Sequence, residues 1–240
     1  MKKDNKKIAA VLAVAFFSSA NSWVNPVMQL ITEAFPNVPP GLIRQVSTLP
    51  ALITMITLLF VGALVGKKFR YVPVVTFGLL CILVGGCLPV FAGSSFSFLM
   101  FSRVIMGIGV GCIGIRNALV IRSFEEPLQT KVLGLVILVI NIGSVLTQQL
   151  SGFLGSLGWK YAFCIYFTAV LPIIFINIWF EEPPKEAVSG KNVNKKGKKL
   201  LSPRVLMYIF VIFGVMLCME RNGLTYEVLS KDIDEIIKNV

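Results

Sequence analysis

Seven long apolar stretches divide this chain, and the loops between them alternate between rich and poor in lysine and arginine. A helix needs about 20 mostly apolar residues to cross the hydrocarbon core of a bilayer. The pattern therefore predicts an all-α, polytopic membrane protein. The candidate spans are residues 8–32, 42–65, 72–91, 98–119, 132–155, 161–180 and 205–219.

The composition agrees with a membrane protein and excludes several other classes. The chain is 55% hydrophobic and 15% charged, whereas soluble domains are about 45–50% apolar and about 25% charged. The net charge of +11 lies largely in loops beside apolar stretches, where it orients a membrane protein, so no nucleic-acid partner is predicted. Histidine is absent and no cysteine pair has the CxxC spacing, so no metal site or cofactor is predicted.

The distribution of basic residues predicts the orientation. Lysine and arginine cluster before the first stretch and in the second, fourth and sixth connections. The other connections, 33–41, 92–97 and 156–160, hold Lys160 as their only basic residue. Basic loops stay on the cytoplasmic side of a membrane. We therefore expect a multi-pass protein of the cell membrane with its N-terminus inside.

The first 20 residues allow a second interpretation. A lysine-rich start, an apolar run and the small residues Ser18, Ser19 and Ala20 are typical of a secretory signal peptide. The apolar run, however, continues to Ile31, which is too long for a signal. A retained first span is therefore favoured.

The sixth connection is the natural domain boundary. Residues 181–204 are polar and lysine-rich, with a basic run at 195–199, as expected of a cytoplasmic linker. The predicted organisation is a six-helix bundle over 1–180, this linker, a seventh helix over 205–219 and a polar tail over 220–240.

A glycine-led basic motif occupies residues 62–70, between the second and third spans. It resembles the pattern G-x-L-x-D-R-x-G-R of one transporter family. The positions that match in kind are Gly62, Leu64, Lys67 and Arg70. Gly66 stands where that family usually has Asp, and Phe69 where it has Gly. The motif would form a cytoplasmic gating loop.

Three further segments resemble patterns of the same family. Residues 103–111 are similar to R-x-x-x-G-x-G-x-G, and 159–163 to G-W-x-x-x-F. Gly143 and Gly152 have the spacing of the first and last glycines in G-x-x-x-G-P-x-x-G-G. With the order of the spans, these motifs make the chain resemble the N-terminal half of a major facilitator superfamily transporter.

The resemblance implies a twelve-helix fold, of which this chain holds one bundle and a seventh helix, as an apparently truncated copy would. It implies secondary active transport of a small solute by alternating access, with no enzymatic activity. In that family, spans one and four of this half line the substrate cavity. The alternative is a half-transporter, or a non-transporting membrane subunit, that pairs with another chain.

Small residues on the fourth and fifth spans predict close helix packing. Gly107, Gly109 and Gly111 recur on the fourth span, and Gly143 and Gly152 on the fifth. Small residues let helix backbones approach each other closely in lipid. The same contacts would serve as a sliding surface if the bundle rocks.

Polar side chains follow one helical face of the first span and one of the fifth. The candidates to line a substrate cavity are Asn21, Ser22, Asn25 and Gln29 on the first span, and Asn141 and Gln148 on the fifth. Polar groups in hydrocarbon require water or partners. Two such faces predict a shared aqueous cavity, and hydrogen bonding between helices is the alternative.

Arg103 is the charged residue that lies farthest from the ends of its predicted span. It lies about 8 Å into the fourth span by helical rise. Near the bilayer centre such a charge costs about 2.5 kcal/mol or more. We expect it to serve the cavity, by holding an anionic group or biasing a proton site. The alternative is that its side chain snorkels to the outer surface.

The first six spans give no support for proton coupling. No Asp or Glu occurs between Glu33 and Glu125, or between Glu126 and Glu181. Coupling to protons requires a titratable group in the membrane. Either Glu33 reaches the cavity, or the coupling site lies in a second half, or transport is uncoupled.

Overall fold

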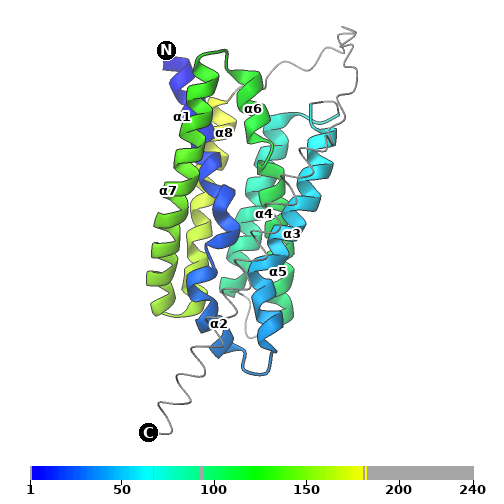
Figure 1. Cartoon of the computed structure of the whole chain (residues 1–240), viewed down its shortest axis with the longest axis vertical. Helices are drawn as coiled ribbons and strands as arrows, with labels where there is room; N and C mark the ends of the chain where they lie inside the picture. Colours follow the sequence, from blue (N-terminus) through cyan, green and yellow to red (C-terminus); the bar gives the residue numbers. More distant parts are fainter. Residues whose placement is uncertain (1, 67, 92–94, 181, 183–240) are drawn as a thin grey trace, which may run out of the picture. The chain divides into compact units, whose positions relative to one another are not determined.

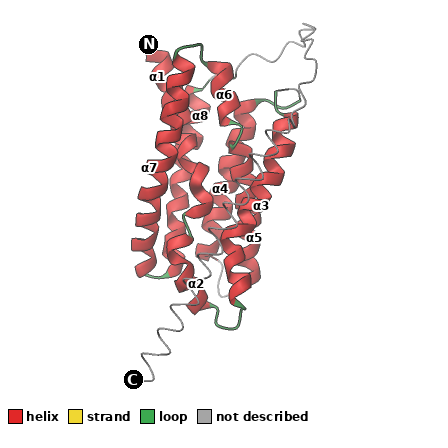
Figure 2. Ribbon diagram, in the orientation of Figure 1, coloured by secondary structure: helices red, strands yellow, loops and turns green. Residues whose placement is uncertain are grey.

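The computed structural model describes residues 2–66, 68–91, 95–180 and 182, and in this part the chain is built of helices (Figures 1 and 2). Six segments are long and apolar enough to cross a membrane: Asp4–Ala34, Pro40–Leu64, Tyr71–Phe91, Phe96–Ser123, Leu128–Ser156 and Trp159–Trp179. They confirm the predicted all-α fold with six spans. The predicted seventh helix at 205–219 and the tail at 220–240 lie outside the described residues, as does the linker except for Glu182.

Three spans are single α-helices, namely α3 (Pro40–Leu64), α4 (Tyr71–Phe91) and α7 (Leu128–Ser156). Their ends differ from the predicted 42–65, 72–91 and 132–155 by four residues or fewer. α3 begins directly at Pro40, a position where the missing N–H of proline costs nothing. These helices follow directly from length and apolarity.

The other three spans are interrupted. The first consists of α1 (Lys2–Phe16), the 3-10 segments η1 (Phe17–Ser22) and η2 (Asn25–Val27), and α2 (Met28–Ala34). The fourth breaks between α5 (Phe96–Ile113) and α6 (Arg116–Ser123), and the sixth begins as η3 (Trp159–Ala169) before α8 (Val170–Trp179). Hydropathy predicts that a segment crosses a bilayer but carries no information about its hydrogen-bond register.

α5 packs between α3 and α4 at close range. Gly107 and Gly111 lie against α3: a Cβ atom on Gly107 would be 2.7 Å from the carbonyl oxygen of Pro50. Gly109 lies against α4, where a Cβ atom would be 2.6 Å from the carbonyl oxygen of Gly78. No larger side chain fits at these positions without moving a backbone.

α7 packs on the first span along α1, η1 and η2. A Cβ atom on Gly143 would be 2.6 Å from the ring of Phe16, so a close contact requires glycine there. A Cβ atom on Gly152 would be 3.5 Å from Pro26, an ordinary van der Waals distance. Gly152 therefore lies at the contact with η2 without being required by it.

Candidate functional site

The first span leaves the α-helical form in the middle of its membrane crossing. Pro26 contributes to this break because it has no N–H to donate. Hydroxyl groups also bond back to nearby carbonyls: Ser22 Oγ donates to Ser19 O at 2.8 Å, a contact that competes with regular helix. Interrupted helices in membranes expose backbone groups that can bind a solute.

Asn21 joins this interrupted segment to two other spans. Its side-chain nitrogen donates to Thr54 Oγ1 on α3 at 3.2 Å. Thr54 Oγ1 in turn donates to Gly107 O on α5 at 3.1 Å. The Asn21 side-chain oxygen is buried and has no hydrogen-bond partner in the described part of the chain. An unpaired acceptor of this kind is available to a ligand or to water.

Asn25 and Gln29 are exposed on the following part of the span. Asn25 Oδ1 accepts a hydrogen bond from Ser47 on α3 at 2.8 Å. Gln29 donates to Glu33 Oε1 at 3.3 Å, one helical turn further on. Glu33 is itself exposed at the end of α2. These groups are accessible, and the bond from Ser47 links η2 to α3.

The polar residues of α7 bond within their own helix. Asn141 is exposed and donates to Ile137 O at 2.8 Å, while half-buried Gln148 donates to Ser144 Oγ at 2.9 Å. α7 contacts η1 and η2, so the two polar sets belong to neighbouring elements. Hydrogen bonding between spans, the alternative to a cavity, occurs for Asn21 and Asn25. A shared cavity remains a prediction.

Arg103 is completely buried in the interior of the bundle. The snorkelling alternative is therefore wrong. Its guanidinium donates to Gly85 O on α4 at 3.2 Å and contacts the sulfur of Met106 at 3.2 Å. These partners are neutral, and no carboxylate lies on α4 or α5. The predicted role in a substrate cavity remains a prediction, since the guanidinium is enclosed in this conformation.

Two aromatic rings of η3 cover the Arg103 guanidinium. Its central carbon lies 4.9 Å from the centroid of Phe163 and 5.8 Å from that of Tyr166. A cation over an aromatic face gains about 0.5–2 kcal/mol, the larger value when water is excluded. The rings therefore offset part of the cost of burying the charge.

Tyr166 connects this buried arginine to the interrupted first span. Its hydroxyl donates to Ala20 O in η1 at 2.8 Å, and its ring stacks on Trp23 with centroids 5.2 Å apart. Gly86 of α4 makes room, because a Cβ atom there would overlap the Tyr166 ring. Arg103, Tyr166 and η1 thus form one contact network, which we call the buried polar cluster.

Tyr166 does not stand out in the sequence as a site residue. The available signal was a tyrosine inside an apolar span, because a buried phenol needs a hydrogen-bond partner. The partner itself was not predictable, since Ala20 lies 146 residues away along the chain.

The gating-loop motif forms a tight turn between α3 and α4. Gly66 has φ +86°, and its N–H donates to Phe69 O at 2.9 Å. This left-handed conformation favours glycine, which gives a local reason for Gly66 in place of Asp. Gly62, Leu64 and Arg70 are exposed, and Lys67 lies outside the described residues.

A second residue that no sequence pattern singles out lies next to this loop. Glu182 accepts hydrogen bonds from the backbone N–H groups of Tyr71 at 2.5 Å and Val72 at 3.0 Å. These are the first two residues of α4, so the carboxylate satisfies free N–H groups and opposes the helix dipole. Arg122 of α6 lies over the Tyr71 ring at 5.4 Å. Three spans therefore meet at this end of the bundle.

Comparison with known proteins decides the family. The profile of the Major Facilitator Superfamily matches residues 10–226. The chain belongs to this superfamily. It is therefore a multi-pass membrane protein of a transporter family, and not an enzyme.

Curated relatives of this superfamily member include bacterial efflux pumps. The multidrug efflux pump SdrM of Staphylococcus aureus (strain N315) is 27% identical over 88% of this chain and 47% of its own length. The purine ribonucleoside efflux pump NepI of Escherichia coli O127:H6 is 30% identical over 65% of this chain and 40% of its own. The chain thus spans about half the length of these relatives.

Solved transporter structures share the fold. A D-xylose-proton symporter matches with a TM-score of 0.59 at 16% identity, over 74% of this chain and 48% of its own. A peptide transporter of the POT type, solved with alafosfalin, matches with a TM-score of 0.63 at 15% identity, over 89% of this chain and 46% of its own. The six-span bundle therefore corresponds to about half of a transporter.

Proposed function

We propose that this chain forms the N-terminal half of a secondary active transporter that moves a small solute by alternating access. The observation that carries the proposal is the interrupted first span, with Asn21, Ser22 and Asn25 in or beside its 3-10 segments. Transporters of this kind bind solute near the bilayer midplane, against interrupted helices at the contact between two bundles.

A second bundle would complete the site. α3 and α7 are the least buried spans, with 11% and 22% of their apolar windows inside the structure, against 39–56% for the other four. The exposed side of α3 carries Ser47 at its bond to Asn25. A second half resting on α3 and α7 would enclose the polar residues of the first span and α7. In the expected orientation, the N-terminus lies in the cytoplasm.

Export is the direction that the relatives favour. Both curated relatives above are efflux pumps, one for multiple drugs and one for purine ribonucleosides. We propose a small organic solute held by hydrogen bonds to amide side chains such as Asn21 and Asn25. The described spans offer no carboxylate between Glu33 and Glu125, so we assign no proton-coupling residue here.

Transport measurements test this proposal. The chain is expressed together with the second half that completes its site, in bacteria that lack their own efflux pumps, and export of ethidium and of a purine ribonucleoside is followed over time. Export that is lost in Asn21→Ala with unchanged membrane expression is the expected result. Export that is unaffected by both Asn21→Ala and Asn25→Ala would remove the interrupted span from the mechanism.

The second candidate function, a half-transporter or subunit paired with another chain, has its own readout. It is favoured by the exposure of α3 and α7. Native mass spectrometry of the purified chain would then show a complex with a second chain, and export would require both. A monomer that exports solute alone contradicts this candidate.

A further inference from the structure

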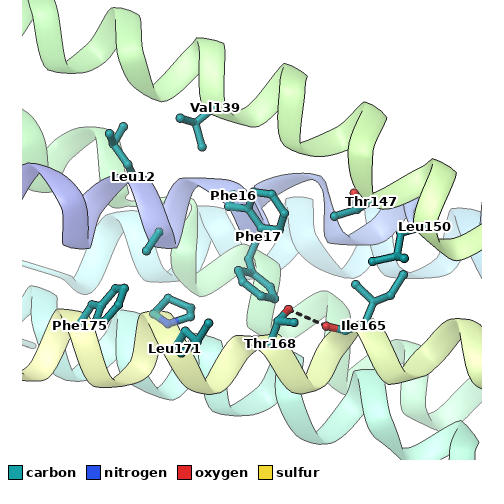
Figure 3. A pocket seen from close by; sticks show the side chains of 12 residues that line it. Leu12, Phe16, Phe17, Val139, Thr147, Leu150, Ile165, Thr168, Leu171 and Phe175 are labelled. Atoms are coloured by element: carbon teal, nitrogen blue, oxygen red, sulfur yellow. Dashed lines mark hydrogen bonds between the residues drawn. The ribbon is translucent and has the colours of Figure 1, made fainter.

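An apolar slot opens between the first span, α7 and the sixth span (Figure 3). It is lined from Leu12 to Phe17 on the first span, from Val139 to Leu150 on α7, and from Ile165 to Phe175 on the sixth span. Its volume is ≈ 460 Å³, within the range of about 300–1,000 Å³ typical of ligand pockets. We call it the side slot.

The lining of the side slot selects an apolar occupant. Among the described residues that line it, Thr147 and Thr168 alone are polar and none is charged. Both hydroxyls already donate to carbonyls of their own helices, Thr147 to Gly143 O and Thr168 to Ile165 O, each at 2.6 Å. An occupant therefore has no unpaired donor to meet, and a polar solute would lose its hydration without compensation.

The dimensions of the side slot suit an extended chain. Val139 and Leu150 are eleven residues apart on α7, which is about 16 Å along a helix. Figure 3 shows the lining side chains spread along the helices, with Leu12, Val139 and Phe175 towards one end and Thr147, Leu150 and Ile165 towards the other. The slot thus runs along the spans, the direction in which acyl chains lie in a bilayer.

Basic residues lie beyond one end of the slot. α1 and α7 both begin at the end of the bundle that carries the N-terminus (Figure 1). Exposed Lys6 lies six residues before Leu12, and exposed Lys131 eight residues before Val139, or about 9 and 12 Å along each helix. Lysines at this level attract anionic headgroups.

We propose that the side slot binds one acyl chain of an anionic membrane phospholipid, whose headgroup lies near Lys6 and Lys131. Exposed Leu150 and Leu171 make the slot continuous with the apolar surface of the spans. Phe16 and Phe17 form one wall at the point where α1 becomes η1. The acyl chain therefore packs against the first span where it leaves the α-helical form, on a side without polar groups. This contact is independent of the solute that is transported.

Trp23 provides a specific reporter for this site. It is 1% exposed, so surrounding lipid does not reach it. Its ring lies 5.1 Å from Phe17 and 5.6 Å from Phe16, both of which line the slot. A brominated acyl chain quenches tryptophan fluorescence only at short range, so quenching of Trp23 reports a chain inside the slot.

The experiment uses the full chain with Trp159→Phe and Trp179→Phe, reconstituted in vesicles of phosphatidylglycerol with or without brominated acyl chains. Trp23 is expected to be quenched by the brominated lipid. Ala13→Phe on α1 and Val139→Phe on α7, both at positions that line the slot, are each expected to abolish most of this quenching. The matched control Val145→Phe on α7, at an exposed position outside the slot, is expected to leave it unchanged.

The headgroup is tested in a second arm. Quenching by a mixture in which only the phosphatidylglycerol is brominated is expected to exceed that by a mixture in which only the phosphatidylcholine is brominated. Lys6→Gln with Lys131→Gln is expected to remove that difference. Three results would overturn the proposal: an unquenched Trp23, which would mean that no acyl chain enters the slot; equal quenching in slot and control variants; or no preference between the two lipids.

Discussion

α5 and the first span both cross the membrane with polar groups inside the bundle, but they are held in place by different contacts. α5 lies against its neighbours through glycines, so that its backbone touches the backbones of α3 and α4. The first span is held by side chains, through Tyr166 to Ala20, Asn21 to Thr54 and Ser47 to Asn25. Backbone contacts fix one arrangement, whereas side-chain hydrogen bonds can be exchanged for bonds to a solute.

This difference divides the bundle into a rigid part and a part that can change its hydrogen-bond partners. The contact of α3, α4 and α5 forms the rigid part, because any displacement opens a gap between closely packed backbones. The first span and η3 form the part that can change, since their 3-10 segments leave backbone groups that other partners can satisfy. Four substitutions test this comparison, in order of their expected effect on stability.

Gly109→Val is expected to be the most damaging. Its Cβ atom would lie 2.6 Å from Gly78 O and 2.8 Å from Ile82, and overpacking of this kind costs about 1–3 kcal/mol. The free energy of unfolding in detergent, followed by circular dichroism, measures the loss. Gly134→Val on α7 is the matched control, because nothing lies within 4 Å of its Cβ position. Equal losses in the two variants would contradict a rigid contact at α5.

Tyr166→Phe removes only the hydroxyl that donates to Ala20 O. It removes the 2.8 Å bond to Ala20 O in η1, which keeps the backbone N–H of Trp23 as a donor at 3.4 Å. The loss of one such hydrogen bond costs about 0.5–1.5 kcal/mol. Amide hydrogen exchange is expected to rise in residues 17–27 more than in α5. Tyr161→Phe, at a tyrosine that is 54% exposed, serves as the control. Uniform faster exchange over the whole bundle would mean that the hydroxyl has no local role.

Glu182→Gln weakens the cap of α4. The amide retains one oxygen for the N–H groups of Tyr71 and Val72 but loses the charge that opposes the helix dipole, a change of about 0.5–1 kcal/mol. Faster hydrogen exchange at the start of α4 is the expected result. Glu125→Gln, at an exposed glutamate, gives the comparison. Slower exchange at Val72 in Glu182→Gln than in the parent chain would exclude a capping role.

Arg103→Met separates stability from function. Methionine has a similar length and removes a fully buried charge, so the loss of two aromatic contacts is offset by the lower cost of burial, and stability changes by less than about 1 kcal/mol. Solute export is nevertheless expected to fall at least tenfold if the guanidinium serves transport. Arg103→Lys, which keeps the charge, is the comparison. Full export by Arg103→Met would make Arg103 a packing residue.

The membrane spans were predictable, and their internal breaks were not. α3, α4 and α7 agree with the apolar stretches to within four residues, because apolar length is what a bilayer demands. The 3-10 segments η1 and η3 depend on bonds formed with other spans, such as Tyr166 with Ala20. A local pattern contains no information about such partners.

The polar residues of the first span could be predicted from the sequence, but the enclosure of Arg103 inside the bundle could not. Asn21 and Asn25 stood out as polar groups in an apolar span, and both bond to α3. Arg103 stood out as an intramembrane charge, yet its enclosure by Phe163 and Tyr166 required the sixth span to be placed. Glu182 was not singled out, because its partners lie about 110 residues earlier in the chain.

The sequence by itself determined that this chain crosses a membrane several times, since hydropathy and length act locally along each segment. It also carried the glycine and basic motifs by which the chain resembles its superfamily. Only the tertiary structure decided which polar groups are shared between spans, where α1 gives way to η1, and that Arg103 is enclosed. The physical reason is that a buried polar group is stable only with a partner, and that partner comes from whichever span packs against it.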